Sequence, residues 1–137
     1  MVRALTVGEK NRRCHMRIKK GLVALTIALT IVTPAQAGQK TAQRNRAIYH
    51  EEFPNVKGNK WDCVNTLFSR ESGWQNRARN GHHYGIPQSY RPNMTEAEVQ
   101  KYLDNPRRQV KDGMRYIRYR YGGTCAAKAH SDSHGWY

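Results

Sequence analysis

The sequence predicts a small, mainly α-helical domain that carries one glycine-rich loop or hairpin. Apolar residues recur at helical spacing in segments that begin near Asn59, Thr95 and Asn105. Between these segments, residues 75–93 are dense in Asn, Gly and Pro, a composition that favours a loop or a short strand hairpin. A chain of 137 residues has room for one ordinary domain, or for one small domain with a tail.

Residues 1–37 have the pattern of a secretory signal peptide. A basic stretch is followed by an apolar run over residues 21–33, and Ala35-Gln36-Ala37 then precedes Gly38. The apolar run is shorter than the ~20 residues that span a bilayer. We therefore predict cleavage after Ala37, which leaves the protein secreted or in the cell wall. The alternative is an uncleaved N-terminal anchor.

The chain is strongly basic, with 24 Lys and Arg against 10 Asp and Glu and a formal net charge of +14. Residues 1–37 hold seven basic residues and one acidic residue, so the remaining 17 basic and nine acidic residues give +8. A basic surface suits nucleic acid, anionic membrane or anionic cell wall without choosing among them. No interleaved basic and aromatic pattern indicates a nucleic-acid module, so specific nucleic-acid binding is not predicted.

Two cysteines remain once Cys14 is removed with the signal peptide. In an oxidising compartment, Cys63 and Cys125 are expected to form a disulfide that closes a loop of about 60 residues and stabilises the fold by roughly 4 kcal/mol. Two unpaired buried thiols are the alternative. A zinc site is disfavoured because the chain has no C-x-x-C pair and its histidines lack ligand spacing.

The region after the signal peptide begins with a polar segment. Residues 38–57 are interpreted as a flexible N-terminal arm that contains a short element near residues 47–53. A strong helix follows, with Asn59 as a plausible N-cap and an end by Gly73. One face of this helix is apolar and consists of Trp61, Val64, Leu67 and Phe68.

Capping residues mark three further helices. Thr95 and Glu98 form a capping box, while Asn105 can cap a helix whose first residue is Pro106 and which ends at Gly122. Thr124 is a candidate cap for a last short helix through about residue 130. The helix after Pro106 carries an apolar stripe, Val110, Met114, Ile117 and Tyr121, and an opposite basic stripe, Arg107, Lys111, Arg115 and Arg118.

Glu71 is an acidic residue on the apolar face of the first strong helix. It follows Leu67 by four residues and Phe68 by three, at the C-terminal end of the helix. Desolvation and the carbonyl end of the helix dipole both disfavour its charge, so we expect a raised pKa. A carboxyl group that stays protonated near neutral pH can act as a general acid. The alternative is that Glu71 turns outward and pairs with Arg70 or Arg79.

Several short blocks around Glu71 and at the C-terminal end resemble a known family. The blocks are Ser69-Arg70-Glu71-Ser72-Gly73-Trp74, Tyr84-Gly85-Ile86-Pro87-Gln88, Asn105-Pro106, the run from Tyr116 to Gly122, Cys125-Ala126-Ala127-Lys128-Ala129-His130 and His134-Gly135-Trp136-Tyr137. Over residues 58–137, the chain resembles the secreted lytic transglycosylase-like domain. The resemblance implies an α+β, lysozyme-like fold in which the loop or hairpin flanks a cleft.

The resemblance also implies a reaction. Glu71 would be the single catalytic acid/base, and the substrate would be the peptidoglycan glycan strand, cut between N-acetylmuramic acid and N-acetylglucosamine. The C6 hydroxyl of the muramyl sugar would attack, which gives a 1,6-anhydro product without a second carboxylate. No metal or organic cofactor is implied, and a monomer is expected. The other implied site residues are Ser72, which supports the site, Tyr84, Gly85, Ile86 and Gln88, which line the sugar groove, and His130, Trp136 and Tyr137, which close the cleft.

Some residues depart from the family pattern, and other functions stay open. The turn Asn80-Gly81-His82-His83 and Lys128 differ from the usual residues, and both histidines are predicted to be exposed in a loop. Trp74 and Tyr84 could equally be core aromatics.

The alternative functions are a non-catalytic wall-binding or adhesion module and a muramidase-type hydrolase that uses water.

The signal-peptide interpretation makes a direct prediction about processing. The secreted form should begin at Gly38, because the small residues Ala35 and Ala37 form the cleavage pattern. N-terminal sequencing of protein recovered from the culture medium checks this. A secreted form that retains the apolar run would contradict it.

Overall fold

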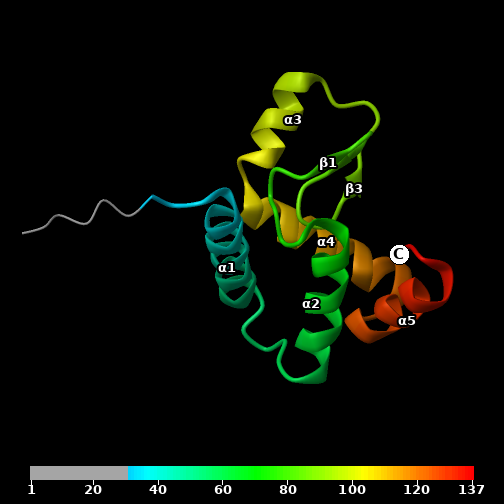
Figure 1. The fold of residues 1–137 in the computed structure, drawn as a ribbon. Helices are drawn as coiled ribbons and strands as arrows, with labels where there is room; N and C mark the ends of the chain where they lie inside the picture. Colours follow the sequence, from blue (N-terminus) through cyan, green and yellow to red (C-terminus); the bar gives the residue numbers. More distant parts are fainter. Residues whose placement is uncertain (1–30) are drawn as a thin grey trace, which may run out of the picture. The chain divides into compact units, whose positions relative to one another are not determined.

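The computed structural model describes residues 31–137. Residues 1–30, which hold most of the predicted signal peptide, lie outside the described residues, so cleavage stays a prediction. Within residues 31–137, no helix combines the length and apolar character needed to cross a membrane. The elements are α1 (Pro34–Glu52), α2 (Asn59–Ser72), β1 (Arg79–Asn80), β2 (His83–Tyr84), β3 (Ser89–Tyr90), α3 (Glu96–Leu103), α4 (Pro106–Tyr121) and α5 (Thr124–His134) (Figure 1).

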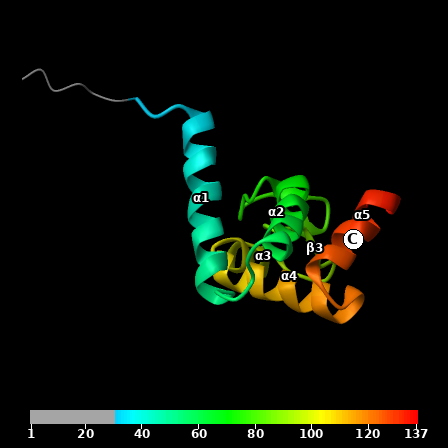
Figure 2. The same ribbon diagram turned by 90° about the horizontal axis from the view of Figure 1, so that it is seen from below.

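The described region is mainly helical, as the sequence predicts. Helix α4 contacts α1, α3 and α5, and α2 packs against α5 (Figures 1 and 2). The three two-residue strands form one antiparallel sheet in the order β1-β2-β3, with Asn80 opposite His83 and His83 opposite Tyr90. This sheet is the hairpin expected within residues 75–93.

Helix α1 corrects the interpretation of residues 38–57 as a flexible arm. Thr33 and Gln36 form a capping box at its start, and the helix continues to Glu52. One face buries Ala42, Asn45 and Tyr49, which lie three and four residues apart. The predicted cleavage site therefore falls in the first turn of α1, and the buried contacts all lie beyond it.

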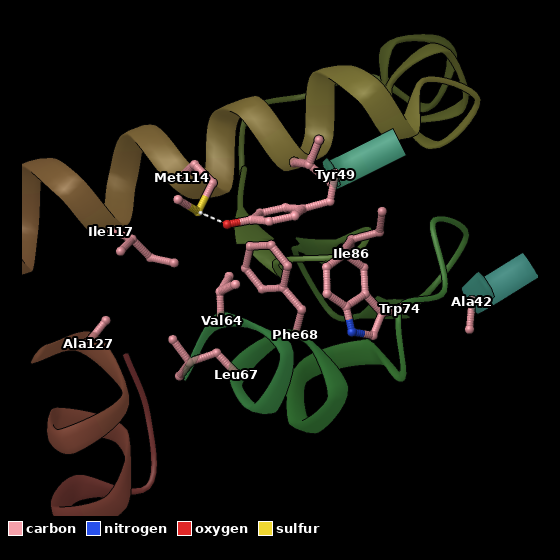
Figure 3. Packing of buried hydrophobic residues seen from close by; sticks show 11 residues of the cluster. Ala42, Tyr49, Val64, Leu67, Phe68, Trp74, Ile86, Met114, Ile117 and Ala127 are labelled. Atoms are coloured by element: carbon pink, nitrogen blue, oxygen red, sulfur yellow. Dashed lines mark hydrogen bonds between the residues drawn. The ribbon is translucent and has the colours of Figure 1, made fainter. Parts of the chain in front are cut away.

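The main core surrounds Tyr49 of α1. Its ring is fully buried and lies 5.3 Å from the ring of Trp61 and 5.8 Å from that of Trp74. Figure 3 shows its hydroxyl group directed at the sulfur of Met114 on α4, a hydrogen bond of 3.5 Å. Burial raises the pKa of Tyr49. Because large aromatic side chains dominate the energetics of a core, this residue joins α1 to the rest of the domain.

The predicted capping residues are largely confirmed. Thr95 and Glu98 form the expected box at α3, and the Asn105 side chain accepts from the Arg108 N–H ahead of Pro106. Two helices differ in detail. Gly58 rather than Asn59 is the N-cap residue of α2, and Gly123 rather than Thr124 is that of α5, which extends to His134. Side chains of α3 form a second, smaller core with the sheet, which contains Tyr84, Val99, Tyr102 and Leu103.

The predicted disulfide is present. Cys63 of α2 is bonded to Cys125 at the start of α5, across a sequence separation of 62 residues. The bond therefore fastens the helix that carries Glu71 to the helix that leads into Trp136 and Tyr137.

Removal of this disulfide should destabilise the domain. We expect the variant with Cys63→Ala and Cys125→Ala to lose about 2–4 kcal/mol of the free energy of unfolding, because its unfolded chain is no longer cross-linked. For a domain of this size, that loss lowers the melting temperature by at least about 8 °C. Thermal unfolding, followed by circular dichroism, measures the difference. Two titratable thiols in freshly secreted wild-type protein would contradict the pairing.

Candidate active site

Glu71 lies next to the last residue of α2, where the chain reverses direction. Gly73 and Trp74 both adopt positive φ, and their N–H groups donate to Ser69 O and Phe68 O to close the helix end. Positive φ is strained for a residue such as Trp74, whose side chain is fully buried and thereby fixed. The turn holds Glu71 at the surface of the core rather than in open solvent.

The Glu71 carboxyl group is half-buried and stands alone. Within residues 31–137, it forms no ion pair or hydrogen bond with a protein group. Burial raises its pKa, and the charge of His83 opposes that shift. The two alternative partners are engaged elsewhere, because Arg70 pairs with Asp132 at 2.5 Å and Arg79 pairs with Glu96 at 2.8 Å.

Two hollows meet at Glu71. Their volumes are about 690 Å³ and about 640 Å³, within the usual range for small-molecule sites. Four residues line both hollows, namely Glu71, His83, Gln88 and Gly135. The hollows therefore form one cleft, and Glu71 lies at the junction of its two halves.

The first half of the cleft is polar. Its lining includes Arg70, Arg79, Asn80 and Asp132. Both arginines are neutralised, and the Arg79 guanidinium lowers the pKa of Glu96 to about 2. This half presents hydrogen-bonding groups with little net charge.

The second half of the cleft is aromatic. Tyr90, Tyr116 and Trp136 line it with 64%, 44% and 50% of their surfaces exposed, so their rings are open to a ligand. Tyr137 also lines it, and its hydroxyl group donates to Pro87 O at 3.3 Å. Burial raises the pKa of Tyr137, and the nearby Glu71 carboxylate adds to that shift.

Four of the predicted site residues lie together in this cleft. They are Glu71, Gln88, Trp136 and Tyr137. Gln88 has a φ of 47°, and its Nε2 donates to Gly85 O at 2.8 Å, which fixes the side chain where the two halves meet. The acid from α2, the loop between β2 and β3 and the C-terminal aromatics thus line one cleft.

Tyr84 and Ile86 do not line the groove, which corrects the role implied for them. Ile86 is completely buried in the main core, and Tyr84 is 8% exposed in the second core. Successive strand residues point to opposite faces, so Tyr84 faces its core while the preceding His83 faces the cleft. Two-residue strands are too short for this alternation to be recognised in the sequence.

Ser72, Gly85 and His130 are not among the residues that line the cleft, but they contact residues that do or the loop that carries them. The Ser72 hydroxyl donates to Ile86 O at 2.8 Å and so joins α2 to the loop that carries Gln88. His130 is absent from the lining described within residues 31–137. Its ring instead stacks on that of His134, 4.1 Å away, and meets Trp136 edge-on at 4.5 Å, which holds the tryptophan at the cleft.

A buried amide network that no sequence pattern indicates holds the loop between β2 and β3 in place. Gln109 of α4 is completely buried; its Oε1 accepts from Ile86 N–H at 2.8 Å, and its Nε2 donates to the carbonyls of Asn76 and Tyr102. Asn76 in turn accepts from Asn45 of α1. Buried polar groups of this kind are expensive to leave unpaired, so the network specifies one loop conformation.

Among the unpredicted residues of the lining, three carry aromatic or imidazole rings. His83, Tyr90 and Tyr116 reach the cleft from β2, β3 and α4. His83 is exposed, as predicted, but its place beside Glu71 depends on the sheet register. The sequence signal for Tyr90 and Tyr116 is that each is a large aromatic residue at a position expected to face solvent.

No group of three or more His, Cys, Asp or Glu side chains that could hold a metal ion occurs in the described part of the chain. Comparison with protein-family models, with curated proteins and with solved structures found no match. The function is therefore inferred from the cleft itself.

The close contact between Gly85 and Gln109 predicts a sharp difference between two glycine substitutions. Gly85 has a φ of +77°, and a Cβ added to it would lie 2.4 Å from Gln109 Oε1. We expect Gly85→Ala to lose more than about 2 kcal/mol of stability through strain and broken buried hydrogen bonds. Gly81→Ala is the control: φ is +56° but no atom lies within 4 Å, so a loss of about 1 kcal/mol is expected. Denaturant unfolding compares them, and equal losses would refute the role of the contact.

Proposed function

We propose that this protein is a peptidoglycan lytic transglycosylase that cuts the glycan strand between N-acetylmuramic acid and N-acetylglucosamine. We further propose that its helical domain has the lysozyme-like fold of that family. The observation that carries the proposal is the half-buried Glu71 carboxyl group, with a raised pKa, at the junction of a polar and an aromatic half-cleft.

The environment of Glu71 suits a general acid. Cleavage of a glycosidic bond requires a proton for the leaving oxygen, and a carboxyl group with a raised pKa still carries that proton at higher pH than an exposed one. Arg70 and Arg79 are paired with Asp132 and Glu96, so neither forms an ion pair with Glu71 that would hold it in the charged form. A purely structural carboxylate would be expected to have a partner, as the acidic groups of the cleft lining do.

The remainder of the cleft suits a chain of uncharged rings. Exposed aromatic rings stack on the apolar faces of sugars, and Tyr90, Tyr116 and Trp136 provide them on one side of Glu71. Each arginine of the lining is paired with a carboxylate, namely Arg70 with Asp132, Arg79 with Glu96 and Arg91 with Asp112. A cleft for nucleic acid would instead present unpaired cations to phosphates.

The other carboxylates of the lining are poorly placed to act as a nucleophile. Both oxygens of Asp132 are engaged, one by Arg70 and the other by Lys128, and these contacts lower its pKa. Asp112 likewise has both oxygens engaged, one by Arg91 and the other by Arg115. Intramolecular attack by the C6 hydroxyl group of the muramyl sugar needs no such residue, and it closes a 1,6-anhydro ring without consuming water.

The disulfide favours action outside the cytoplasm, because such bonds persist in oxidising compartments. Together with the predicted signal peptide, it supports the cell wall as the place of action and peptidoglycan as the partner. The excess of basic residues would promote encounter with an anionic wall through long-range attraction.

Glu71→Gln is the decisive substitution. It retains the shape of the side chain but cannot deliver a proton, so we expect the rate of glycan cleavage to fall by ~10²–10⁴-fold. Mass analysis of peptidoglycan incubated with residues 38–137 measures both rate and product. The wild-type products should be anhydro-muropeptides, one water lighter than those of a lysozyme.

The stability of the same variant provides a control for folding. Because folding raises the pKa of Glu71, its ionisation opposes folding, and the penalty grows as the pH rises through the folded-state value. Glu71→Gln should therefore melt above the wild type at neutral pH and lose this advantage in acid. If Glu71→Gln cleaves glycan at the wild-type rate, the assignment of Glu71 is refuted. If the wild-type protein binds peptidoglycan without releasing any product, it is an adhesion module. If the wild-type products contain an added water, the protein is a muramidase.

A further inference from the structure

A second surface of the protein carries an excess of positive charge that the cleft does not. In the described part of the chain, the cleft lining holds equal numbers of arginines and carboxyl groups, namely Arg70, Arg79, Arg91, Glu71, Asp112 and Asp132. Two other hollows, of about 540 Å³ and about 760 Å³, are lined by four cations and one carboxylate: Lys60, Lys111, Arg115, Arg118 and Glu52. We call these two hollows together the basic groove.

Arg118 is the central residue of the basic groove, because it lines both hollows. Arg118 and Lys60 are exposed, and within residues 31–137 neither forms an ion pair with a carboxylate. The two other cations are partly neutralised, since Lys111 lies 2.7 Å from a Glu52 oxygen and Arg115 pairs with an acidic residue of the cleft. The groove therefore contains two cations whose charge is available to a ligand.

Helix α4 separates the basic groove from the cleft. Asp112, Gly113 and Tyr116 of this helix line the cleft, whereas Arg115 and Arg118 line the groove. Among the described residues, none that lines the cleft also lines the groove. A ligand in the groove therefore leaves the cleft open to a glycan strand.

We propose that the basic groove binds a linear phosphodiester polymer of the cell wall, in which alcohol units are joined by phosphates. The inference rests on the proposed function only for the place of action. A guanidinium such as that of Arg118 binds phosphate through two parallel hydrogen bonds, and the ammonium of Lys60 binds it as a point charge. Because the polymer carries one negative charge per repeat, its first contact with the groove raises the effective concentration of the next phosphate.

The shape and lining of the groove favour a chain over a membrane. Met114 and Ile117 are buried and line the larger hollow, so its inner wall is apolar and suits the carbon atoms of the alcohol units. A lipid surface would instead favour several exposed apolar side chains beside the cations. Of the large hydrophobic residues described in the groove lining, Tyr119 alone is exposed, and its ring ends in a hydroxyl group that can donate to phosphate.

The starts of two helices add to the positive potential of the larger hollow. The first residues of α2 and α5 line it, and the N-cap residues, Gly58 and Gly123, provide no side chain to accept from the N–H groups of the first turn. Free N–H groups at a helix start attract anions. Asp62, the acidic residue in the first turn of α2, lines a different hollow. The helix starts thus reinforce the charge of Lys60 and Arg118.

Two double variants test the groove at an equal loss of charge. Lys60→Gln with Arg118→Gln, the groove variant, removes its two unpaired cations. Arg44→Gln with Lys101→Gln, the control variant, removes one arginine and one lysine that are exposed, have no ion pair within residues 31–137 and lie outside the groove lining. Binding of the secreted protein to poly(glycerol phosphate) is measured by titration calorimetry at 0.15 M salt.

We expect the dissociation constant of the groove variant to rise by about 10-fold or more, because charge-assisted hydrogen bonds to phosphate are lost. The control variant should stay within about threefold of the wild type, since charges away from the ligand are screened over about 8 Å at this ionic strength. The salt dependence of binding should weaken in the groove variant alone. Arg118→Lys keeps the charge and should bind more tightly than Arg118→Gln, and every variant should melt near the wild-type temperature.

The outcomes separate this inference from the proposed function. An equal loss of affinity in the two double variants, wild-type affinity of the groove variant, or no binding by the wild type would overturn the groove. Tighter wild-type binding to DNA, to polyglutamate or to vesicles of anionic phospholipid would overturn the choice of polymer. Glu71→Gln should bind the polymer as the wild type does, and the groove variant should cleave glycan strands stripped of phosphate polymer at the wild-type rate. Glycan cleavage without polymer binding would therefore overturn this inference alone, and polymer binding without any glycan product would overturn the proposed function alone.

Discussion

The geometry of the cleft depends on the buried amide of Gln109. This side chain accepts a hydrogen bond from the backbone of Ile86 and donates to the carbonyls of Asn76 and Tyr102, so one residue of α4 connects the loop between β2 and β3, the turn after α2 and the end of α3. Every polar group in such a network must be paired, and the loop therefore has little freedom to slide. The close approach to Gly85 adds a steric condition, because any side chain there would displace the amide.

This constraint explains how a short polar loop becomes part of a precise site. The sheet contributes only two residues per strand and cannot be stable alone. Gln109 on one side and the Ser72 hydroxyl on the other both bind the backbone of Ile86, whose side chain is completely buried. The loop is thereby fixed relative to α2, and Gln88 and His83 are held beside Glu71.

Most of the helices were predictable because their signals are local. Asn105 with Pro106, and Thr95 with Glu98, each combine a capping side chain with the start of an apolar period, and such signals are visible in a few neighbouring residues. Glu71 was recognisable for the same reason, as a carboxylate on an apolar helix face. The disulfide followed from counting cysteines.

Helix α1 and the composition of the cleft were not predictable, because they depend on tertiary contacts. The buried face of α1 includes Asn45, whose amide bonds to Trp74 O and Asn76, so no continuous apolar stripe marks the helix. His83 and Tyr84 are neighbours with opposite roles, and only the sheet register decides which of them faces the cleft. A two-residue strand is too short to show an alternation, and the buried face of α1 is not apolar throughout.

The distribution of charge also separates the cleft from the rest of the protein. Residues 38–137 carry a net charge of +8, yet the arginines that line the cleft are paired with Asp132, Glu96 and Asp112. An unpaired guanidinium beside Glu71 would stabilise the carboxylate and lower its pKa, which would remove the proton that a general acid must hold. Ion pairing within the lining therefore has a consequence beyond local stability. It allows a basic protein to keep one carboxyl group in its cleft with a raised pKa.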